Sequence, residues 1–209
     1  MKKLFTILTV VILTTTISFA QSGTVAIGVG SNLANEAWQD YHLIPTVGYF
    51  VSDAIMVGTG FSMGSSSEEE VDISSLTKTS SEGSSFEMSP FLRFYLSEAF
   101  YASVGIAIGS GSTESTSTSS VSAGDWNKSE TSSSTFGLNA GVGYSLMWND
   151  RICIEPSFGI ATGSGSGTSN SSSATGGVLS TNPAADYDEP TTFGMAIGLG
   201  IHIRLGGDE

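Results

Sequence analysis

The chain has 209 residues with a formal net charge of −13, from 20 acidic and 7 basic residues. This charge excludes a nucleic-acid partner, because binding to phosphate backbones requires a basic face. The 26 glycines argue against a long-helix protein, and the 39% hydrophobic content, which falls in regular blocks, argues against simple disorder.

Residues 1–20 have the pattern of a secretory signal peptide. Two lysines precede an apolar run over 4–19, which ends in the small-residue sequence Ser18-Phe19-Ala20. A spanning helix is the alternative, but three threonines interrupt the run, and a span needs about 20 apolar residues. We therefore expect cleavage between Ala20 and Gln21, which leaves one exported domain over 21–209.

From residue 21 onward, large apolar residues alternate with small ones, which is the period of a β-strand. The clearest block ends the chain, where Phe193, Met195 and Ile197 alternate with glycine and alanine. The pattern predicts eight strands, at 24–32, 42–51, 55–63, 85–96, 100–109, 135–148, 152–163 and 192–205.

The connections between these strands alternate in length. Three are tight turns with an acidic residue in the middle, at 52–54, 97–99 and 149–151. Four are long and rich in serine, threonine, glycine and acids, at 33–41, 64–84, 110–134 and 164–191. Short turns at one end and long loops at the other, on an even number of strands, predict an all-β fold: an eight-stranded antiparallel up-and-down transmembrane β-barrel.

Residue size indicates which face of the barrel meets lipid. Eight strands enclose an interior just wide enough for packed side chains, so small and charged residues fit the lumen and large apolar ones face outward. A soluble barrel with an apolar interior is the alternative. Aromatic residues mark both ends of the outward register, as in interfacial girdles: Phe61, Phe86, Phe136 and Phe193 near the long loops, and Tyr49, Phe94, Phe100 and Trp148 near the tight turns.

With these features the chain resembles the small eight-stranded outer-membrane barrels, such as the OmpA transmembrane domain and the OmpX type. The resemblance covers 21–209 and rests on the hairpin arrangement. It implies a porin-like protein in the outer membrane of a Gram-negative bacterium, with outer-membrane lipid and the insertion machinery as partners. The last strand departs from the family pattern, since it ends at Arg204-Leu205 and not on an aromatic residue.

Four charged residues fall in the inward register: Glu87, Arg93, Glu155 and Arg204. Their distances from the turns place the last three at similar depth, and a charge in a narrow lumen is costly unless it is paired. We predict a Glu155–Arg204–Arg93 cluster, with Glu87 higher in the lumen. The favoured interpretation is a polar plug, and a gate or proton path is the alternative.

The sequence offers little for catalysis or metal binding. The two histidines, His42 and His202, have no acid or second histidine at metal-ligand spacing. Cys153 is the only cysteine, which excludes an internal disulfide, and its inward position predicts a packed thiol without a histidine base. We therefore expect no metal, no cofactor and no enzymatic activity.

The long loops carry the candidates for contact with the outside. Two acidic runs, at 68–72 and 186–189, have oxygen ligands for Ca²⁺ but lack EF-hand spacing, so solvated acidic faces are favoured. The loop over 110–134 has the β-branched content of a strand. It predicts either a polar ribbon with Trp126 at its end or a disordered loop, and an exposed tryptophan favours a contact role.

These patterns lead to two functional hypotheses. The leading one is a structural or surface-interaction protein whose acidic loops bind an extracellular ligand or surface partner. The alternative is a narrow channel or small-solute transport through the lumen. A membrane enzyme is disfavoured, because no Ser/His or Asp/His constellation falls on one rim of the barrel.

Overall fold

The computed structural model describes residues 22–32, 44–74, 76–119, 124–148 and 151–206. The predicted signal peptide and the first long connection, at 33–41, lie outside these residues. No helix in the described part of the chain is long and apolar enough to cross a membrane.

Nine strand segments follow one another along the described chain: β1 (Val25–Asn32), β2 (Ile44–Ser52), β3 (Ile55–Asp72), β4 (Thr77–Tyr95), β5 (Phe100–Ser119), β6 (Trp126–Tyr144), β7 (Leu146–Trp148), β8 (Ile152–Thr175) and β9 (Val178–Leu205). Both β6 and β7 pair with β8, and the pairs Gly143↔Ser157 and Leu146↔Ile154 keep one register across the interruption. The two segments therefore act as a single strand, interrupted at Ser145.

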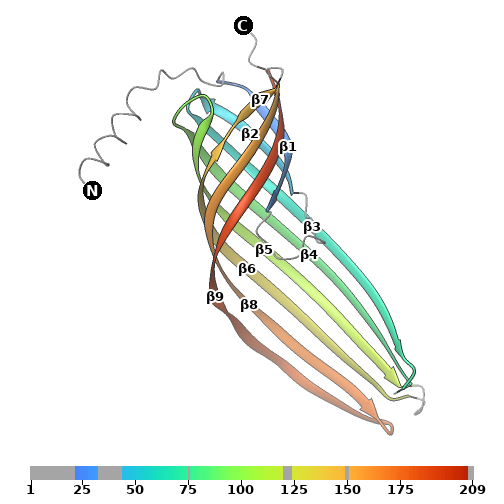
Figure 1. Ribbon diagram of the computed structural model, residues 1–209. Helices are drawn as coiled ribbons and strands as arrows, with labels where there is room; N and C mark the ends of the chain where they lie inside the picture. Colours follow the sequence, from blue (N-terminus) through green and yellow to red (C-terminus); the bar gives the residue numbers. More distant parts are fainter. Residues whose placement is uncertain (1–21, 33–43, 75, 120–123, 149–150, 207–209) are drawn as a thin grey trace.

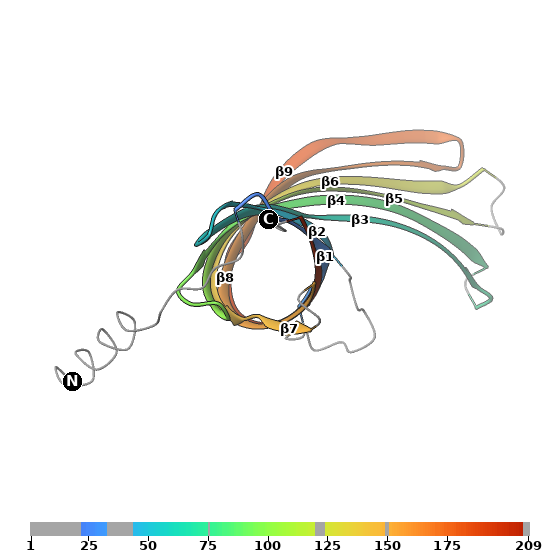
Figure 2. The same cartoon turned by 90° about the horizontal axis from the view of Figure 1, so that it is seen from above.

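The strands form a closed ring. Neighbours along the chain pair in antiparallel fashion, and β1 closes the ring by pairing with β9 over its whole length, from Val25↔Leu205 to Asn32↔Gly198. The ring is seen end-on in Figure 2. This confirms the predicted fold class, an eight-stranded up-and-down β-barrel.

Two of the predicted tight turns lie in the described residues, and each is held by a side chain. Between β2 and β3, the Asp53 carboxylate accepts a hydrogen bond from the Ser22 backbone N–H at 3.0 Å. Between β4 and β5, the Ser97 hydroxyl accepts one from the Phe100 backbone N–H at 3.1 Å. The polar residues that indicate these turns in the sequence therefore also stabilise them.

The prediction of three long loops, at 64–84, 110–134 and 164–191, is wrong, because most of these residues belong to strands. The hairpins β3–β4, β5–β6 and β8–β9 continue far beyond the barrel as one six-stranded sheet (Figure 1). We call this sheet the ribbon, and it comprises residues 64–72, 77–85, 110–119, 126–135, 164–175 and 178–192. Of the two structures predicted for 110–134, the described residues adopt the polar ribbon.

The ribbon strands lack apolar alternation because both faces of the sheet are polar. Hydroxyl pairs link neighbouring strands instead: Thr79 with Ser117 at 3.0 Å, Ser84 with Ser112 at 2.9 Å, and Ser132 with Thr168 at 2.8 Å. Cross-strand pairs of this kind stabilise a sheet by roughly 0.2–1 kcal/mol each. Strands predicted from alternating hydrophobicity therefore stop at the membrane boundary, whereas the strands themselves continue into the ribbon.

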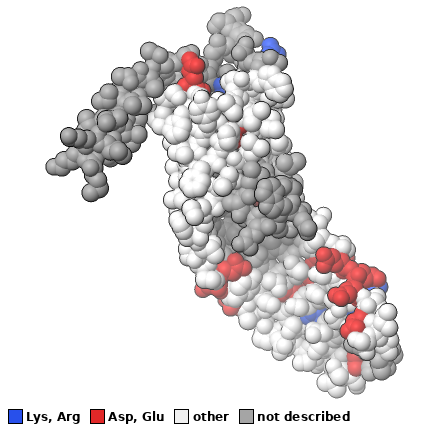
Figure 3. Space-filling view, viewed as in Figure 1, with Lys and Arg blue, Asp and Glu red and all other residues white. Residues whose placement is uncertain are grey.

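Large apolar side chains cover the outer wall of the barrel and remain exposed, such as Ile27, Leu138 and Ile203, each 48–49% exposed. The space-filling view shows a barrel wall with little charge and acidic residues gathered over the ribbon (Figure 3). A band of exposed apolar residues around a closed barrel requires lipid, not water, as its surroundings.

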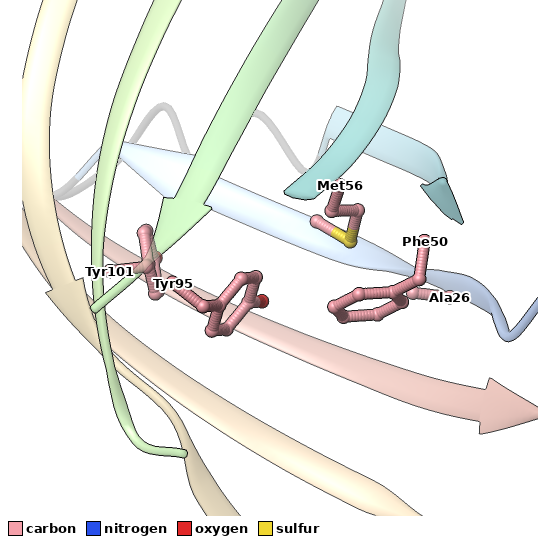
Figure 4. Close-up of a cluster of buried hydrophobic side chains, with 5 residues drawn as sticks. All are labelled: Ala26, Phe50, Met56, Tyr95 and Tyr101. Atoms are coloured by element: carbon pink, nitrogen blue, oxygen red, sulfur yellow. The ribbon is translucent and has the colours of Figure 1, made fainter. Parts of the chain in front are cut away.

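The buried core lies inside the ring, at the tight-turn end. Ala26, Phe50, Met56, Tyr95 and Tyr101 come from five successive strands and cluster in the lumen (Figure 4). The sequence analysis expects small and charged residues at the inward positions, but bulky residues also occupy some of them. Bulky residues fill one end of the lumen, and smaller ones line the rest.

Candidate functional site: the plugged lumen and the extended ribbon

An ion pair crosses the lumen. Arg93 Nη1 on β4 donates a hydrogen bond to Glu155 Oε2 on β8 at 2.5 Å, and both side chains are largely buried. In the ring, β5 and β6 separate these two strands, so the pair joins opposite walls. Two of the four lumen charges predicted from the sequence therefore meet directly.

The Glu155 carboxylate is surrounded by further polar groups. Ser145 stands opposite Glu155 in the register of β8, and its hydroxyl donates to Glu155 Oε1 at 2.9 Å. Two weaker contacts reach the same oxygen, from Cys153 Sγ at 3.4 Å and the Tyr95 hydroxyl at 3.5 Å. Saturating a buried carboxylate in this way offsets much of the cost of removing it from water.

His202 is the lumen residue whose role the sequence analysis missed. Its Nδ1 lies 3.0 Å from Glu155 Oε2, off the direct hydrogen-bond line, and its Nε2 lies 2.9 Å from the Thr46 hydroxyl. The register also places it opposite Cys153, where no histidine was expected. Its inward position two residues before Arg204 was the available signal. Cys153 is fully buried and contacts Glu155, which leaves a packed thiol.

Arg204 does not join the carboxylate cluster, contrary to the prediction. Its guanidinium carbon lies 5.1 Å from the ring centre of Phe50 and 6.0 Å from that of Tyr95. Within the described residues its buried Nη2 has no hydrogen-bond partner. The reason is register: the partner of Glu155 on β9 is Gly200, so Arg204 lies four residues farther toward the tight turns.

Aromatic rings connect the two arginines. Tyr95 lies between Phe50 and Tyr101, with its ring centre 5.3 Å from that of Phe50 and 5.4 Å from that of Tyr101. The guanidinium carbon of Arg93 lies over the Tyr101 ring, 4.7 Å from its centre. Cation–π contacts in desolvated sites contribute up to about 2 kcal/mol each. We call this assembly the plug, and it consists of Phe50, Arg93, Tyr95, Tyr101, Glu155, His202 and Arg204.

Glycines on the inner wall make room for the plug. A Cβ added to Gly143 would lie 2.2 Å from the Tyr101 ring, and one added to Gly28 would lie 2.5 Å from the His202 ring. At Gly194 the same addition meets nothing within 4 Å. Gly143 and Gly28 therefore leave space that a bulky plug residue occupies, whereas Gly194 faces open space.

Above the plug the lumen contains a cavity of about 420 Å³. Glu87 lines its wall and accepts a hydrogen bond from the Ser89 hydroxyl at 3.0 Å, while Arg93, Phe91 and Asn139 line other parts. Glu87 therefore lies away from the Arg93–Glu155 pair. This places it where the sequence analysis put it, higher in the lumen, with a neutral partner.

The eight aromatic residues predicted to face lipid all have exposed side chains, with exposed fractions between 38% for Phe100 and 72% for Phe193. They are Tyr49, Phe61, Phe86, Phe94, Phe100, Phe136, Trp148 and Phe193. Their strands place Tyr49, Phe94, Phe100 and Trp148 near the tight turns and the other four near the ribbon.

The ribbon places three glutamates in one row across neighbouring strands. Glu82 pairs with Glu114, and Glu114 pairs with Glu130. Like charges directly opposite each other destabilise a sheet. Lys128 relieves part of this repulsion, because its Nζ lies 3.0 Å from Glu114 and 2.7 Å from Glu130. The hydrogen bond from Lys128 lowers the pKa of Glu130, and the two carboxylates raise the pKa of Lys128.

The acidic runs predicted to lie in loops lie along ribbon strands. On β3, Glu69 forms an ion pair with Lys78 at 2.9 Å, with both side chains more than half exposed. On β9, Asp186 and Asp188 pair in register with Thr168 and Ser166. Across the described residues, no group of three or more His, Cys, Asp or Glu side chains is placed to hold a metal ion.

Trp126 begins β6 at the distal end of the ribbon and is half-buried, not fully exposed as the contact hypothesis assumed. It pairs with Thr118 on β5 and Ala174 on β8. Next to it, the Asp125 carboxylate accepts a hydrogen bond from the Gly176 backbone N–H at 2.8 Å, which ties two hairpin tips together.

The model of the autotransporter beta-domain family matches residues 22–201. No curated protein matches the sequence.

Three solved structures are similar in fold. Ail, the attachment invasion locus protein of Yersinia pestis, is 14% identical with a TM-score of 0.40, covering 88% of this chain and 100% of that one. CarO2 of Acinetobacter baumannii is 11% identical with a TM-score of 0.38 and the same coverage. The N-terminal β-barrel domain of Pseudomonas aeruginosa OprF is 12% identical with a TM-score of 0.37, covering 88% and 98%.

Proposed function

The chain belongs to the family of autotransporter beta-domains, and on this basis we propose that it anchors an extracellular contact surface in the outer membrane. Family membership and the closed barrel confirm two predictions: the resemblance to small outer-membrane barrels and the location in the Gram-negative outer membrane. In this proposal the barrel fixes the protein in lipid, and the ribbon makes contact with a surface partner.

The plug supports this role for the barrel. Phe50 and Tyr101 are at most 2% exposed, and the Arg93–Glu155 pair spans the space between opposite walls. Opening a path past these groups would require breaking a buried ion pair, and leaving one buried charge unpaired costs about 3–5 kcal/mol. A barrel packed in this way is suited to stable anchoring.

The ribbon supports the contact role and is the observation that carries the proposal. Six strands extend beyond the aromatic residues Phe61, Phe86, Phe136 and Phe193 as one continuous sheet with ordered cross-strand pairs. Anchoring alone does not need such an extension. A preformed sheet, unlike a flexible loop, presents side chains in fixed positions and reduces the entropy lost on binding.

The test compares the full protein with a variant whose three long hairpins are shortened to the membrane boundary by short turns in place of 65–84, 111–134 and 165–191. Cells displaying each protein are applied to surfaces coated with basic, neutral or acidic proteins. We expect the full protein to be retained on at least one coating and the shortened variant on none. Equal heat-modifiable gel mobility checks that both barrels fold. Equal retention of both would contradict the proposal.

Small-solute transport is the second candidate, favoured by the cavity of about 420 Å³ above the plug. It requires the plug to open. Swelling of proteoliposomes in solutions of small sugars and amino acids measures such a path directly. We expect no swelling above that of empty liposomes, and solute-dependent swelling would make transport the leading function.

A further inference from the structure

Exposed apolar side chains gather at the distal end of the ribbon, on its strands and in the turn between β3 and β4. Ile73 is 83% exposed, Val178 71% and Leu179 67%, and Val71 and Leu76 are also exposed. Elsewhere in the described ribbon no large hydrophobic side chain is exposed. We call this group, together with the half-buried Trp126, the distal rim.

The distal rim is ordered by the sheet register. One row of paired residues runs across all six ribbon strands, from Val71 through Lys78, Thr118, Trp126 and Ala174 to Leu179. Paired residues share a face of the sheet, and neighbouring strands are about 4.8 Å apart, so the row is roughly 24 Å wide. The hydrogen bond from the Gly176 N–H to Asp125 holds the β8–β9 tip against the β5–β6 tip.

One residue of the distal rim stands in an unfavourable backbone conformation. Leu76 has a φ of 50°, a left-handed conformation that favours glycine or asparagine at a turn. Its side chain is 49% exposed, so burial returns little of this cost. An exposed leucine in this conformation marks Leu76 as a candidate contact residue.

The surroundings of the distal rim decide what it contacts. The rim begins about 33 Å along the strand from Phe136, ten residues away, which is far from the protein's own membrane. Behind it lie the row Glu82–Glu114–Glu130 and the β3 residues Glu68 and Glu70. This acidic field repels anionic lipid headgroups and a second copy of the same ribbon, and it attracts a basic surface.

We propose that the distal rim docks into an apolar patch bordered by lysine and arginine residues on a partner protein. The inference rests on the proposed function and specifies the chemistry of the partner. The exposed apolar side chains of the distal rim supply desolvated contact area, and the glutamates behind them select for a basic border.

The test uses the mature protein in lipid nanodiscs and three kinds of bead that carry butyl groups, amine groups or both. We expect retention to be greatest on the mixed beads. The variant Ile73→Ser/Leu179→Ser should lower that retention about threefold or more, to the amine-only level. The matched variant Glu82→Gln/Glu114→Gln should lower it toward the butyl-only level. Wild-type retention by either variant on mixed beads would overturn the inference.

Leu76→Asn separates contact from structure. Asparagine tolerates the left-handed conformation, so hairpin amides should exchange more slowly with solvent while retention on the mixed beads falls. If Leu76 had only a structural role, amide exchange would slow while retention on the mixed beads stayed unchanged. That result would contradict its place in the contact surface.

Two further measurements test the other possible partners of the distal rim, a lipid surface and a second copy of this chain. Binding to phosphatidylcholine vesicles, or pairing of nanodiscs through their ribbons in a sizing experiment, would overturn the choice of a basic protein partner. If shortening the hairpins abolishes cell attachment while the distal-rim variants are retained on the mixed beads like the wild type, only the distal-rim inference fails. If shortening has no effect, the proposed function itself fails.

Discussion

The lumen and the ribbon share six strands but place their charged side chains in opposite surroundings. Inside the barrel, charged groups such as Arg93 and Glu155 are removed from water and must find one another. In the ribbon, Glu82, Glu114 and Glu130 remain in solvent, and three like charges stand in one row with a single lysine beside them. Burial therefore decides the energy of a charge pair: the lumen pairs should control stability, and the ribbon charges should control recognition.

Removing the lumen carboxylate should have the largest effect. Glu155→Ala leaves Arg93 and His202 without their acidic neighbour and should reduce the free energy of unfolding by about 3–5 kcal/mol. Urea unfolding in phospholipid vesicles measures this. The matched change Glu87→Ala removes a carboxylate whose hydrogen bond within the described residues comes from Ser89, and it should cost less than about 1 kcal/mol. Equal losses would mean that burial does not separate the two sites.

Filling the space beside a plug ring should come next. Gly143→Ala places a methyl group 2.2 Å from the Tyr101 ring, and such overpacking costs about 1–3 kcal/mol. The same change at Gly194 meets open space and should leave the unfolding midpoint nearly unchanged. If both substitutions behave alike, then Tyr101 does not occupy the lumen position described above.

Cutting the bond between two hairpin tips should have a local effect. Asp125→Ala removes the acceptor for the Gly176 N–H, a loss of about 0.5–1.5 kcal/mol confined to the distal end of the ribbon. Amide hydrogen exchange at Gly176 should accelerate about tenfold or less, with no change in urea unfolding of the barrel. A lowered barrel midpoint would show that ribbon and barrel unfold as one unit.

The smallest effect should come from the exposed lysine. Lys128 lowers the pKa of Glu130, so the stabilisation from this pair is present above the ordinary glutamate pKa and is lost as the pH falls through the lowered value. Lys128→Gln should raise the pKa of Glu130 toward its ordinary range. Carboxyl chemical shifts recorded over a pH titration measure this change, and an unchanged midpoint would show that the pair does not form.

Much of the barrel could be predicted from the sequence. Alternation over Phe193, Met195 and Ile197 carries the strand period, and the acidic tight turns set the order of hairpins. The ribbon strands could not be found in this way, because serine and threonine fill both faces and the hydrophobic period disappears. Their hydrogen-bonding pairs become visible only once the register is known.

The lumen cluster was predicted only in part, for a geometric reason. Depth along a strand placed Arg93 and Glu155 together, but depth alone does not fix which neighbours meet. In the register of β9, His202 comes beside Glu155 and Arg204 lies farther toward the tight turns, against Phe50. The pairing of one strand with the next therefore decides the cluster, and the sequence does not display it.

The most direct test of a closed anchor is planar-bilayer conductance of the refolded mature protein beside Glu155→Gln. We expect a silent wild type, because the plug closes the tight-turn end of the lumen, and occasional small openings in the variant, where the ion pair to Arg93 is lost. Discrete, reproducible conductance steps in the wild type would contradict this expectation and would make the lumen, not the ribbon, the functional part of the protein.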